Sequence, residues 1–265
     1  HVMCEKPMAK TAAEAEAMLA VHKKTGKKLT IGYQNRFRAD SMYLKKVCER
    51  GDLGEIYFAK AHALRRRAVP TWGVFLDEEK QGGGPLIDLG VHVIDLVRYL
   101  SGNPQPVSVY GATFQKLYDR KGAVGAPKYL ASSATDHDIC DVEDLASAMI
   151  RFDNGEVLSI EAAFSLNIKQ DTGEIELFGT KAGAKISPEL EIFGEENHYL
   201  TNMSFAAPTA LDFNGLFEGE IDHYIDCLTG RAEQCKSPAE DGIALMKILE
   251  AVYESARTGH EVIIT

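Results

Sequence analysis

The chain has 265 residues, of which 45% are hydrophobic and 26% charged, and its formal net charge is −10. These proportions are typical of a folded globular protein, and the negative charge disfavours nucleic acid as a partner, because binding to phosphates relies on concentrated Lys and Arg. The apolar runs fall far short of the roughly 20 residues that span a bilayer, so we expect a soluble protein with no membrane partner.

The chain opens with a strand, a helix and a second strand. Residues 1–4 are apolar and suited to a strand, and residues 12–24 carry Ala, Glu, Met and Leu at helical spacing. Thr11 is placed to cap this helix and Gly26 to end it. Residues 28–33 (KLTIGY) read as the next strand. Because a helix connects the two strands, we expect them to pair in parallel.

The rest of the chain changes character and becomes rich in strands. Helices are expected at 41–50, 85–100, 217–228 and 239–256, and strands at 55–64, 107–118, 143–152, 156–165, 174–178, 184–193 and 261–264. Successive strands without helices between them favour an open, largely antiparallel sheet with helices on one face. We therefore predict an α/β remnant of a parallel sheet at 1–35 and an α+β domain at 36–265.

The helix at 85–100 carries the sharpest chemical signal. It follows three glycines and is apolar on nearly every side, yet Asp88, His92 and Asp95 recur at positions i, i+4 and i+7. A carboxylate one turn from an imidazole can orient it and stabilise its charged form, as a general acid or base requires. The alternative is a core histidine that is simply paired with one of the carboxylates.

A second signal is the Glu5-Lys6-Pro7 segment after the first strand. The carboxyl end of a parallel strand is where open α/β sheets bind ligands, and Pro7 would stiffen the turn that presents Lys6. The alternative is an ordinary surface lysine.

Residue types that bind metals occur in two further patterns, and neither predicts a metal site. The cysteines are odd in number and widely spaced (Cys4, Cys48, Cys140, Cys227 and Cys235), which favours reduced thiols in a cytoplasmic protein without a disulfide framework or zinc cluster. Ligand-type residues also gather at Asp136, His137, Asp138, Asp141, Glu143 and Asp144. Neighbours on an extended chain point to opposite faces, so we expect a solvated acidic loop there.

Three segments together resemble one known family, that of glucose-fructose oxidoreductase, inositol dehydrogenase and the rhizopine-catabolism dehydrogenases. They are residues 1–7 (HVMCEKP), 32–37 (GYQNRF) and 82–92 (GGGPLIDLGVH). The resemblance implies a Rossmann domain followed by an open-sheet domain, with cofactor and substrate meeting between them. It also implies a dehydrogenase that moves hydride between NAD or NADP and a sugar or cyclic polyol.

The resemblance further implies roles for individual residues. His92 would take the proton from a substrate hydroxyl, Asp88 would orient His92, and Lys6 would hydrogen-bond the reacting oxygen and the cofactor. Trp72 is expected either to wall the substrate pocket or to anchor its own loop. The residues expected at the cofactor are Glu5, Lys6, Pro7, Gln34, Asn35 and Arg36.

One departure from the family is the missing G-x-G-x-x-G turn, whose backbone N–H groups bind the pyrophosphate. We therefore expect about 90 to 120 further residues with this motif before His1 in the parent protein. We also expect this 265-residue chain alone to bind NAD weakly or not at all, and to be inactive.

Two other functions compete with plain oxidoreduction. One is an NAD-dependent glycoside hydrolase of the same fold, which oxidises its sugar only transiently. The other is a non-catalytic assembly module, because the open sheet is expected to hold a homodimer or homotetramer together. Lys6 and the D-x-G-x-H pattern at residues 88–92 favour the dehydrogenase.

Overall fold

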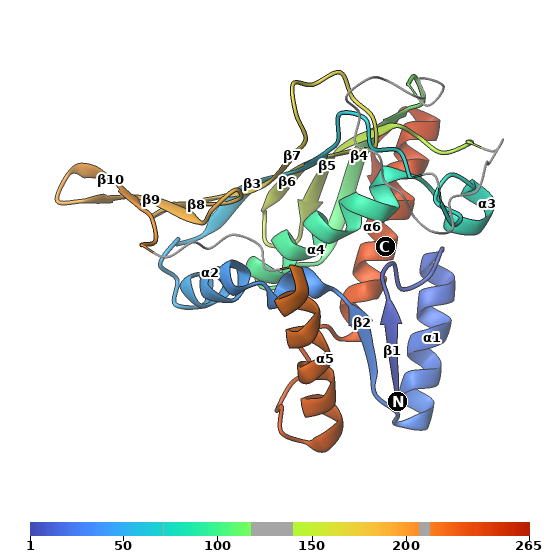
Figure 1. Ribbon diagram of the computed structural model, residues 1–265, viewed down its shortest axis with the longest axis horizontal. Coiled ribbons are helices and arrows are strands. Elements are labelled where there is room, and N and C mark those ends of the chain that lie inside the picture. The colour runs from blue at the N-terminus through green and yellow to red at the C-terminus, as the bar shows by residue number, and fades with distance from the viewer. Residues whose placement is uncertain (71, 118–139, 207–212) are drawn as a thin grey trace.

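The computed structural model describes residues 1–70, 72–117, 140–206 and 213–265. A two-stranded sheet near the N-terminus lies beside a nine-stranded sheet that helices cover on one side (Figure 1). This arrangement confirms the predicted combination of a small parallel sheet and a large open one. The helices are α1 (Ala12–Thr25), η1 (Gln34–Phe37), α2 (Ala39–Glu49), α3 (Glu78–Gln81), η2 (Leu86–Gly90), α4 (Val91–Leu100), α5 (Phe213–Thr229) and α6 (Ala239–Thr258).

The small sheet consists of β1 (Val2–Glu5) and β2 (Leu29–Gly32), which pair in parallel as predicted. Thr11 caps α1 through a capping box with Glu14, in which each side chain accepts a bond from the other residue's backbone N–H. Gly26 ends the helix in the left-handed conformation, at a φ of 64°. Local sequence signals are therefore sufficient to form this unit.

The large sheet runs in the order β10-β9-β8-β7-β3-β6-β5-β4-β11. The β3–β6 pair is parallel, and the other neighbours are antiparallel. Gly155, at a φ of 90°, lies in the hairpin turn between the two predicted strands β5 and β6. The strands are β3 (Ile56–Leu64), β4 (Pro106–Phe114), β5 (Leu145–Phe152), β6 (Val157–Ala163), β7 (Thr172–Gly179), β8 (Gly183–Ile186), β9 (Glu191–Glu196), β10 (Tyr199–Met203) and β11 (Val262–Ile263).

The prediction of one strand at 184–193 is wrong, because the structure divides this segment into β8 and β9. Ser187 has a positive φ of 85° and Pro188 has no N–H to give to a sheet, so the chain turns between the two strands. The short α3 and the exposed β10 were not predicted. In β10 every residue is exposed, so the strand carries no alternation of apolar and polar residues for the sequence to show.

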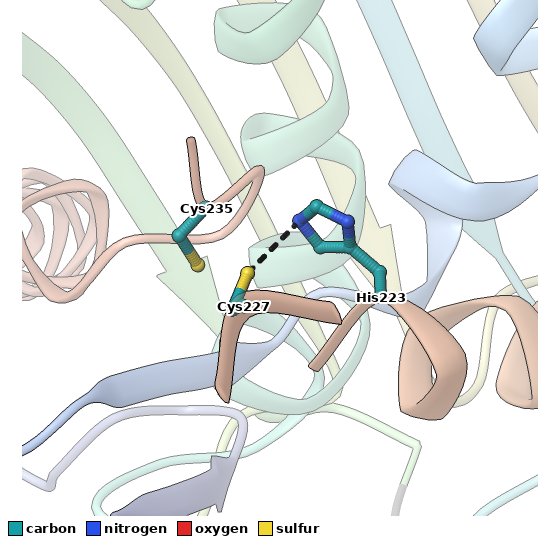
Figure 2. Close-up of side chains that lie close together, drawn as sticks. All are labelled: His223, Cys227 and Cys235. Atoms are coloured by element: carbon teal, nitrogen blue, oxygen red, sulfur yellow. Dashed lines mark hydrogen bonds between the residues drawn. The ribbon is translucent and has the colours of Figure 1, made fainter. Parts of the chain in front are cut away.

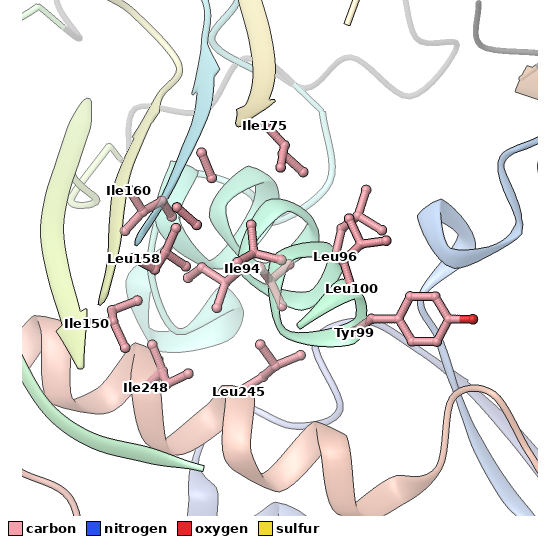
Figure 3. Packing of buried hydrophobic residues seen from close by; sticks show 14 of the residues in the cluster. Ile94, Leu96, Tyr99, Leu100, Ile150, Leu158, Ile160, Ile175, Leu245 and Ile248 are labelled. Atoms are coloured by element: carbon pink, nitrogen blue, oxygen red, sulfur yellow. The ribbon is translucent and has the colours of Figure 1, made fainter. Parts of the chain in front are cut away.

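The hydrophobic core lies between the large sheet and α6, and α4 runs through it (Figure 3). Ile94 of α4 lies among Leu158 of β6 and Leu245 of α6, and all three are fully buried. The same apolar cluster extends to Met8, which follows β1, and to Ile31 of β2. Core residues from both sides of position 35 therefore pack together, and the domain boundary predicted there stays a prediction. Among the described residues, no helix has the length and apolar character needed to cross a bilayer.

Candidate active site

The two chemical signals of the sequence meet in the folded chain. Lys6, just past the end of β1, reaches Asp88 of η2, and the Lys6 ammonium lies 2.8 Å from the Asp88 carbonyl oxygen and 2.9 Å from its Oδ1. The two side chains are only 14% and 13% exposed. Lys6 is therefore a largely buried, ion-paired lysine at the carboxyl end of a parallel strand and not an ordinary surface residue.

The helix that carries Asp88 and His92 opens with a π turn, η2, and continues directly as α4. Such wide turns are rare in proteins overall, and those that occur often lie at functional sites. Its start is held by Glu143, whose carboxylate accepts bonds from the N–H groups of Gly84 (3.0 Å) and Leu86 (3.1 Å). These N–H groups have no partner within the helix, so the carboxylate caps it.

Tyr253 of α6 completes this support by donating its hydroxyl to Glu143 at 2.9 Å. Gly83 has a φ of 155°, and a Cβ there would overlap the Tyr253 hydroxyl. The room that the missing side chain of Gly83 leaves is thus taken by Tyr253.

The prediction of a solvated acidic loop is wrong for its C-terminal part. Glu143 and Asp144 are 9% and 4% exposed. Glu143 caps the helix, and Asp144 accepts the N–H groups of Lys116 and Leu117. Their carboxylates are buried because they satisfy backbone donors that have no other partner. Asp141 is more exposed and accepts the Glu78 N–H at 2.7 Å, while Asp136, His137 and Asp138 lie outside the described residues.

His92 is partly buried, and its Nδ1 has no hydrogen-bond partner. Burial lowers the pKa of His92 to about 3, and the positive charges of Lys6 and Arg65 add to the shift. The imidazole is therefore neutral near neutral pH, and one of its two ring nitrogens carries a lone pair. Within the described residues Asp88 makes its bonds to Lys6, and no hydrogen bond joins it to His92.

Asp95, the third member of the expected polar stripe, lies away from this chemistry. It is fully buried and receives two bonds from Arg36, at 2.9 Å from Nε and 2.5 Å from Nη2. Arg36 also donates to Asp241 of α6 at 2.8 Å. The guanidinium thus ties η1, α4 and α6 together inside the protein.

The remaining candidates lie around the ends of the parallel strands. Glu5 is opposite Gly32 in the last pair of the β1–β2 register, and Pro7 follows Lys6. Gln34 and Asn35 begin η1 directly after β2, and Gln34 Oε1 is buried without a partner. Trp72 packs its ring edge-on against Phe75, with the ring centroids 5.9 Å apart.

Sequence reasoning did not find Glu143 and Tyr253 as supports of the site. Glu143 stands in an acidic stretch that is typical of a loop, and Tyr253 stands in a helix with ordinary amphipathic spacing. Neither residue carries a local signal, because their partners are 57 to 110 residues away.

The fold and this set of residues define an oxidoreductase with a nucleotide-binding unit and an open-sheet domain. The family model "Oxidoreductase family, C-terminal alpha/beta domain" matches residues 45–264. The model "Oxidoreductase family, NAD-binding Rossmann fold" matches residues 1–33. The chain belongs to this family, that of glucose-fructose oxidoreductase, inositol dehydrogenase and the rhizopine-catabolism dehydrogenases, as its sequence patterns suggested.

Individual relatives cover nearly the whole chain. D-glucoside 3-dehydrogenase of Escherichia coli is 36% identical over 263 residues, which are 99% of this chain and 72% of the relative. The aldose-aldose oxidoreductase of Caulobacter crescentus, solved with glycerol, is 27% identical, with a TM-score of 0.76 over 99% of this chain and 72% of that one. Levoglucosan dehydrogenase, solved with NADH and L-sorbose, shares the fold at a TM-score of 0.80 and 22% identity, over 100% of this chain and 73% of that one.

Proposed function

We propose that this chain forms the catalytic face of a dehydrogenase that oxidises a hydroxyl group of a sugar or cyclic polyol with NAD or NADP. The observation that carries the proposal is the Lys6–Asp88 pair, whose aspartate lies on the same helix as the neutral His92. Similarity to a D-glucoside dehydrogenase over 99% of the chain supports a sugar as the substrate class.

His92, Lys6 and Asp88 have different roles in the removal of a hydroxyl proton. His92 is neutral and accepts the proton through an imidazole nitrogen. An ammonium has three protons, and Lys6 gives its bonds to the carbonyl and carboxylate of one residue, Asp88. The proton that remains is available to the reacting oxygen, so Asp88 acts by holding Lys6 in place.

The residues around the strand ends fit a nicotinamide. Gln34 has a buried amide oxygen without a partner, and Lys6 brings a positive charge to the same edge of the sheet. We assign Glu5, Lys6, Pro7, Gln34 and Asn35 to the cofactor. When bound, the nicotinamide supplies the hydride acceptor. Arg36 is left out, because its guanidinium is fully buried and bonded to Asp95 and Asp241.

Two further assignments complete the proposal. Trp72 contributes an aromatic wall for the substrate, since apolar ring faces commonly pack against sugars and its contact with Phe75 holds the ring. The open face of the large sheet mediates self-association, because Tyr110 of β4 and Met149 of β5 are exposed on neighbouring strands, at 55% and 45%.

The competing functions differ in their products. A glycoside hydrolase of this fold returns its cofactor to the starting state and releases an aglycone, whereas a dehydrogenase accumulates reduced cofactor. A non-catalytic module does neither. Membership of an oxidoreductase family with an NAD-binding segment favours net oxidation.

The test uses the enzyme at the natural length of its gene product. Glucosides, free aldoses and inositols are offered with NAD⁺ and NADP⁺, and formation of reduced nicotinamide is followed by absorbance. His92→Ala should lower kcat by about two to four orders of magnitude, the usual contribution of a positioned acid or base. His62→Ala, which changes a partly buried histidine on β3, is the matched control.

Circular dichroism establishes that both variants are folded. A folded His92→Ala enzyme with unchanged turnover would remove His92 from the mechanism. Aglycone release without net reduced nicotinamide would point to the hydrolase.

A further inference from the structure

A second cluster of reactive side chains lies at the end of α5. His223 and Cys227 are one turn apart on this helix, and Cys235 comes from the loop that follows. One ligand atom from each residue lies within 4.8 Å of the others. Figure 2 shows the three side chains directed toward the same small space. None of them takes part in the proposed dehydrogenase chemistry.

The spacing of the donor atoms fits a tetrahedral metal ion. Zinc binds thiolate sulfur at about 2.3 Å and imidazole nitrogen at about 2.0 Å, so a sulfur and a nitrogen on one tetrahedral zinc are about 3.5 Å apart. Cys227 Sγ lies 3.5 Å from His223 Nε2. This edge of the coordination shell is therefore already present before any metal binds.

The loop that carries Cys235 is fixed in place by the small sheet. Ile31 of β2 donates its N–H to the Ser237 carbonyl at 3.1 Å, and Thr30 Oγ1 lies 3.4 Å from Cys235 Sγ. Cys235 is thus held near α5 by backbone pairing with a strand far away in the sequence. A metal at this point would join α5, the loop and the edge of the nucleotide-binding unit.

His223 Nε2 also accepts the Lys236 N–H, at 2.9 Å. A neutral imidazole nitrogen has one lone pair, so a metal and this N–H compete for it. The bond turns the lone pair toward the loop that holds Cys235. Metal binding would replace the amide proton, and the Lys236 N–H would turn to solvent.

We propose that His223 Nε2, Cys227 Sγ and Cys235 Sγ bind one Zn²⁺ ion, with water as the fourth ligand. Two thiolates and an imidazole are the donor set that zinc prefers among common divalent ions. Binding converts two thiols to thiolates and releases two protons, so the charge of the bound site is zero. Asp226, the carboxylate next to Cys227, is bonded to Arg231 at 2.6 Å and is not needed as a ligand.

Water reaches the fourth position because the site is only partly enclosed. Cys227 is buried, whereas His223 and Cys235 are partly exposed. A zinc ion here would hold the loop against α5 in the way that a structural metal holds a short segment. Its expected effect is therefore on the stability of this junction.

The experiment measures zinc in the untagged, reduced enzyme at its natural length, after addition of one equivalent of ZnCl₂ and gel filtration. The expected result is one zinc ion per chain, measured by elemental mass spectrometry. Cys227→Ser and Cys235→Ser should each lower the affinity for zinc at least about tenfold in competition with a chromophoric chelator. Cys48→Ser, which changes a partly buried thiol on α2, should leave the affinity unchanged.

A second measurement needs no variant. Co²⁺ in place of zinc should give the intense visible bands of a tetrahedral ion and thiolate-to-cobalt charge-transfer absorption. An octahedral cobalt spectrum would overturn the proposal, as would a zinc content no higher than that of the Cys227→Ser, Cys235→Ser double variant. A Cys227–Cys235 disulfide in protein isolated without reductant, with no zinc uptake after reduction, would also overturn it.

Discussion

Asp88 bonds to Lys6 and makes no bond to His92 among the described residues. The carboxylate can therefore serve the reaction through the lysine, whereas the family resemblance implied that it serves through the histidine. The two roles predict different couplings between the residues. Coupling is measurable, because residues that act as one unit give non-additive losses.

We predict that Asp88→Asn lowers kcat by about 10- to 100-fold. In a Lys6→Met background the same change should cost little more, since the partner of the carboxylate is already gone. The measurement is kcat for the four proteins of the double-mutant cycle. Losses that multiply would show that Asp88 acts independently of Lys6.

A second residue-scale prediction concerns Glu156, which is fully buried and bonded to Ser101 at 2.9 Å. Burial raises the pKa of Glu156 to about 7, against partial opposition from its hydrogen bonds. A carboxyl group whose pKa is raised in the folded state stabilises the protein below its unfolded pKa, near 4.3. This contribution is lost as the pH rises through 7.

Glu156→Gln should therefore remove part of the loss in stability between pH 5 and pH 8. One pKa unit corresponds to about 1.4 kcal/mol. Between pH 5 and pH 8, the free energy of unfolding should therefore fall by up to about 3 kcal/mol less in the variant than in wild type. Urea unfolding at both pH values measures it. Glu161→Gln, which changes a partly buried carboxyl group on β6, is the control. Equal pH dependence in wild type and Glu156→Gln would contradict the assignment.

At the scale of elements, the helix that carries the site is positioned from outside its own sequence. Glu143 and Tyr253 hold its start. Arg36 joins its middle to η1 and α6 through Asp95 and Asp241. Removing one partner of a buried ion pair is strongly destabilising, so the Arg36 network defines how these elements pack. Asp88 and His92 therefore owe their position to residues on three other segments.

Glu143→Gln should reduce both stability and activity, because an amide offers only one acceptor oxygen to the two backbone donors and the tyrosine. We expect a loss of about 1 to 2 kcal/mol in the free energy of unfolding, as for other helix caps, together with a lower kcat. Urea unfolding and steady-state kinetics measure the two effects.

The control for Glu143→Gln is Glu254→Gln. Glu254 is a half-exposed residue on α6 whose partner is Arg257, and surface pairs of this kind contribute little. If Glu143→Gln matched this control in both stability and kcat, the cap would have no part in positioning the helix.

At the scale of the whole molecule, the large sheet has helices on one face and exposes apolar side chains on the other. Tyr110 of β4 and Met149 of β5 stand directly opposite each other in the strand register. Exposed apolar side chains gathered on one sheet face are a common mark of a protein interface. The self-association that we propose would bury them.

The Tyr110→Lys, Met149→Lys double variant should shift the enzyme from oligomer to monomer. Two charges on each copy would have to be buried without partners in a symmetric interface. Light scattering at tens of micromolar protein measures the mass. Val21→Lys, at a 60% exposed apolar position on α1, is the control. An unchanged mass in the double variant would place any interface elsewhere.

Local signals were sufficient for much of the fold. Thr11 and Gly26 define the bounds of α1, and Gly155 defines a hairpin, because caps and turns depend on a few adjacent residues. Apolar residues on nearly every side predicted the buried helix of Asp88 and His92. The sequence failed where a strand is exposed, as in β10, and where a turn interrupts an apolar run, as at Pro188.

The sequence by itself determined the family, the order of most elements and the candidacy of Lys6 and His92. Only the tertiary structure decided which side chains pair with these residues. Lys6 meets Asp88 across 82 residues and Arg36 meets Asp241 across 205. The loop beyond α5 brings Cys235 to His223 and Cys227, although the spacing of the cysteines suggested no metal site. Such contacts depend on which faces pack together, and packing of a whole core is not encoded in any short stretch of chain.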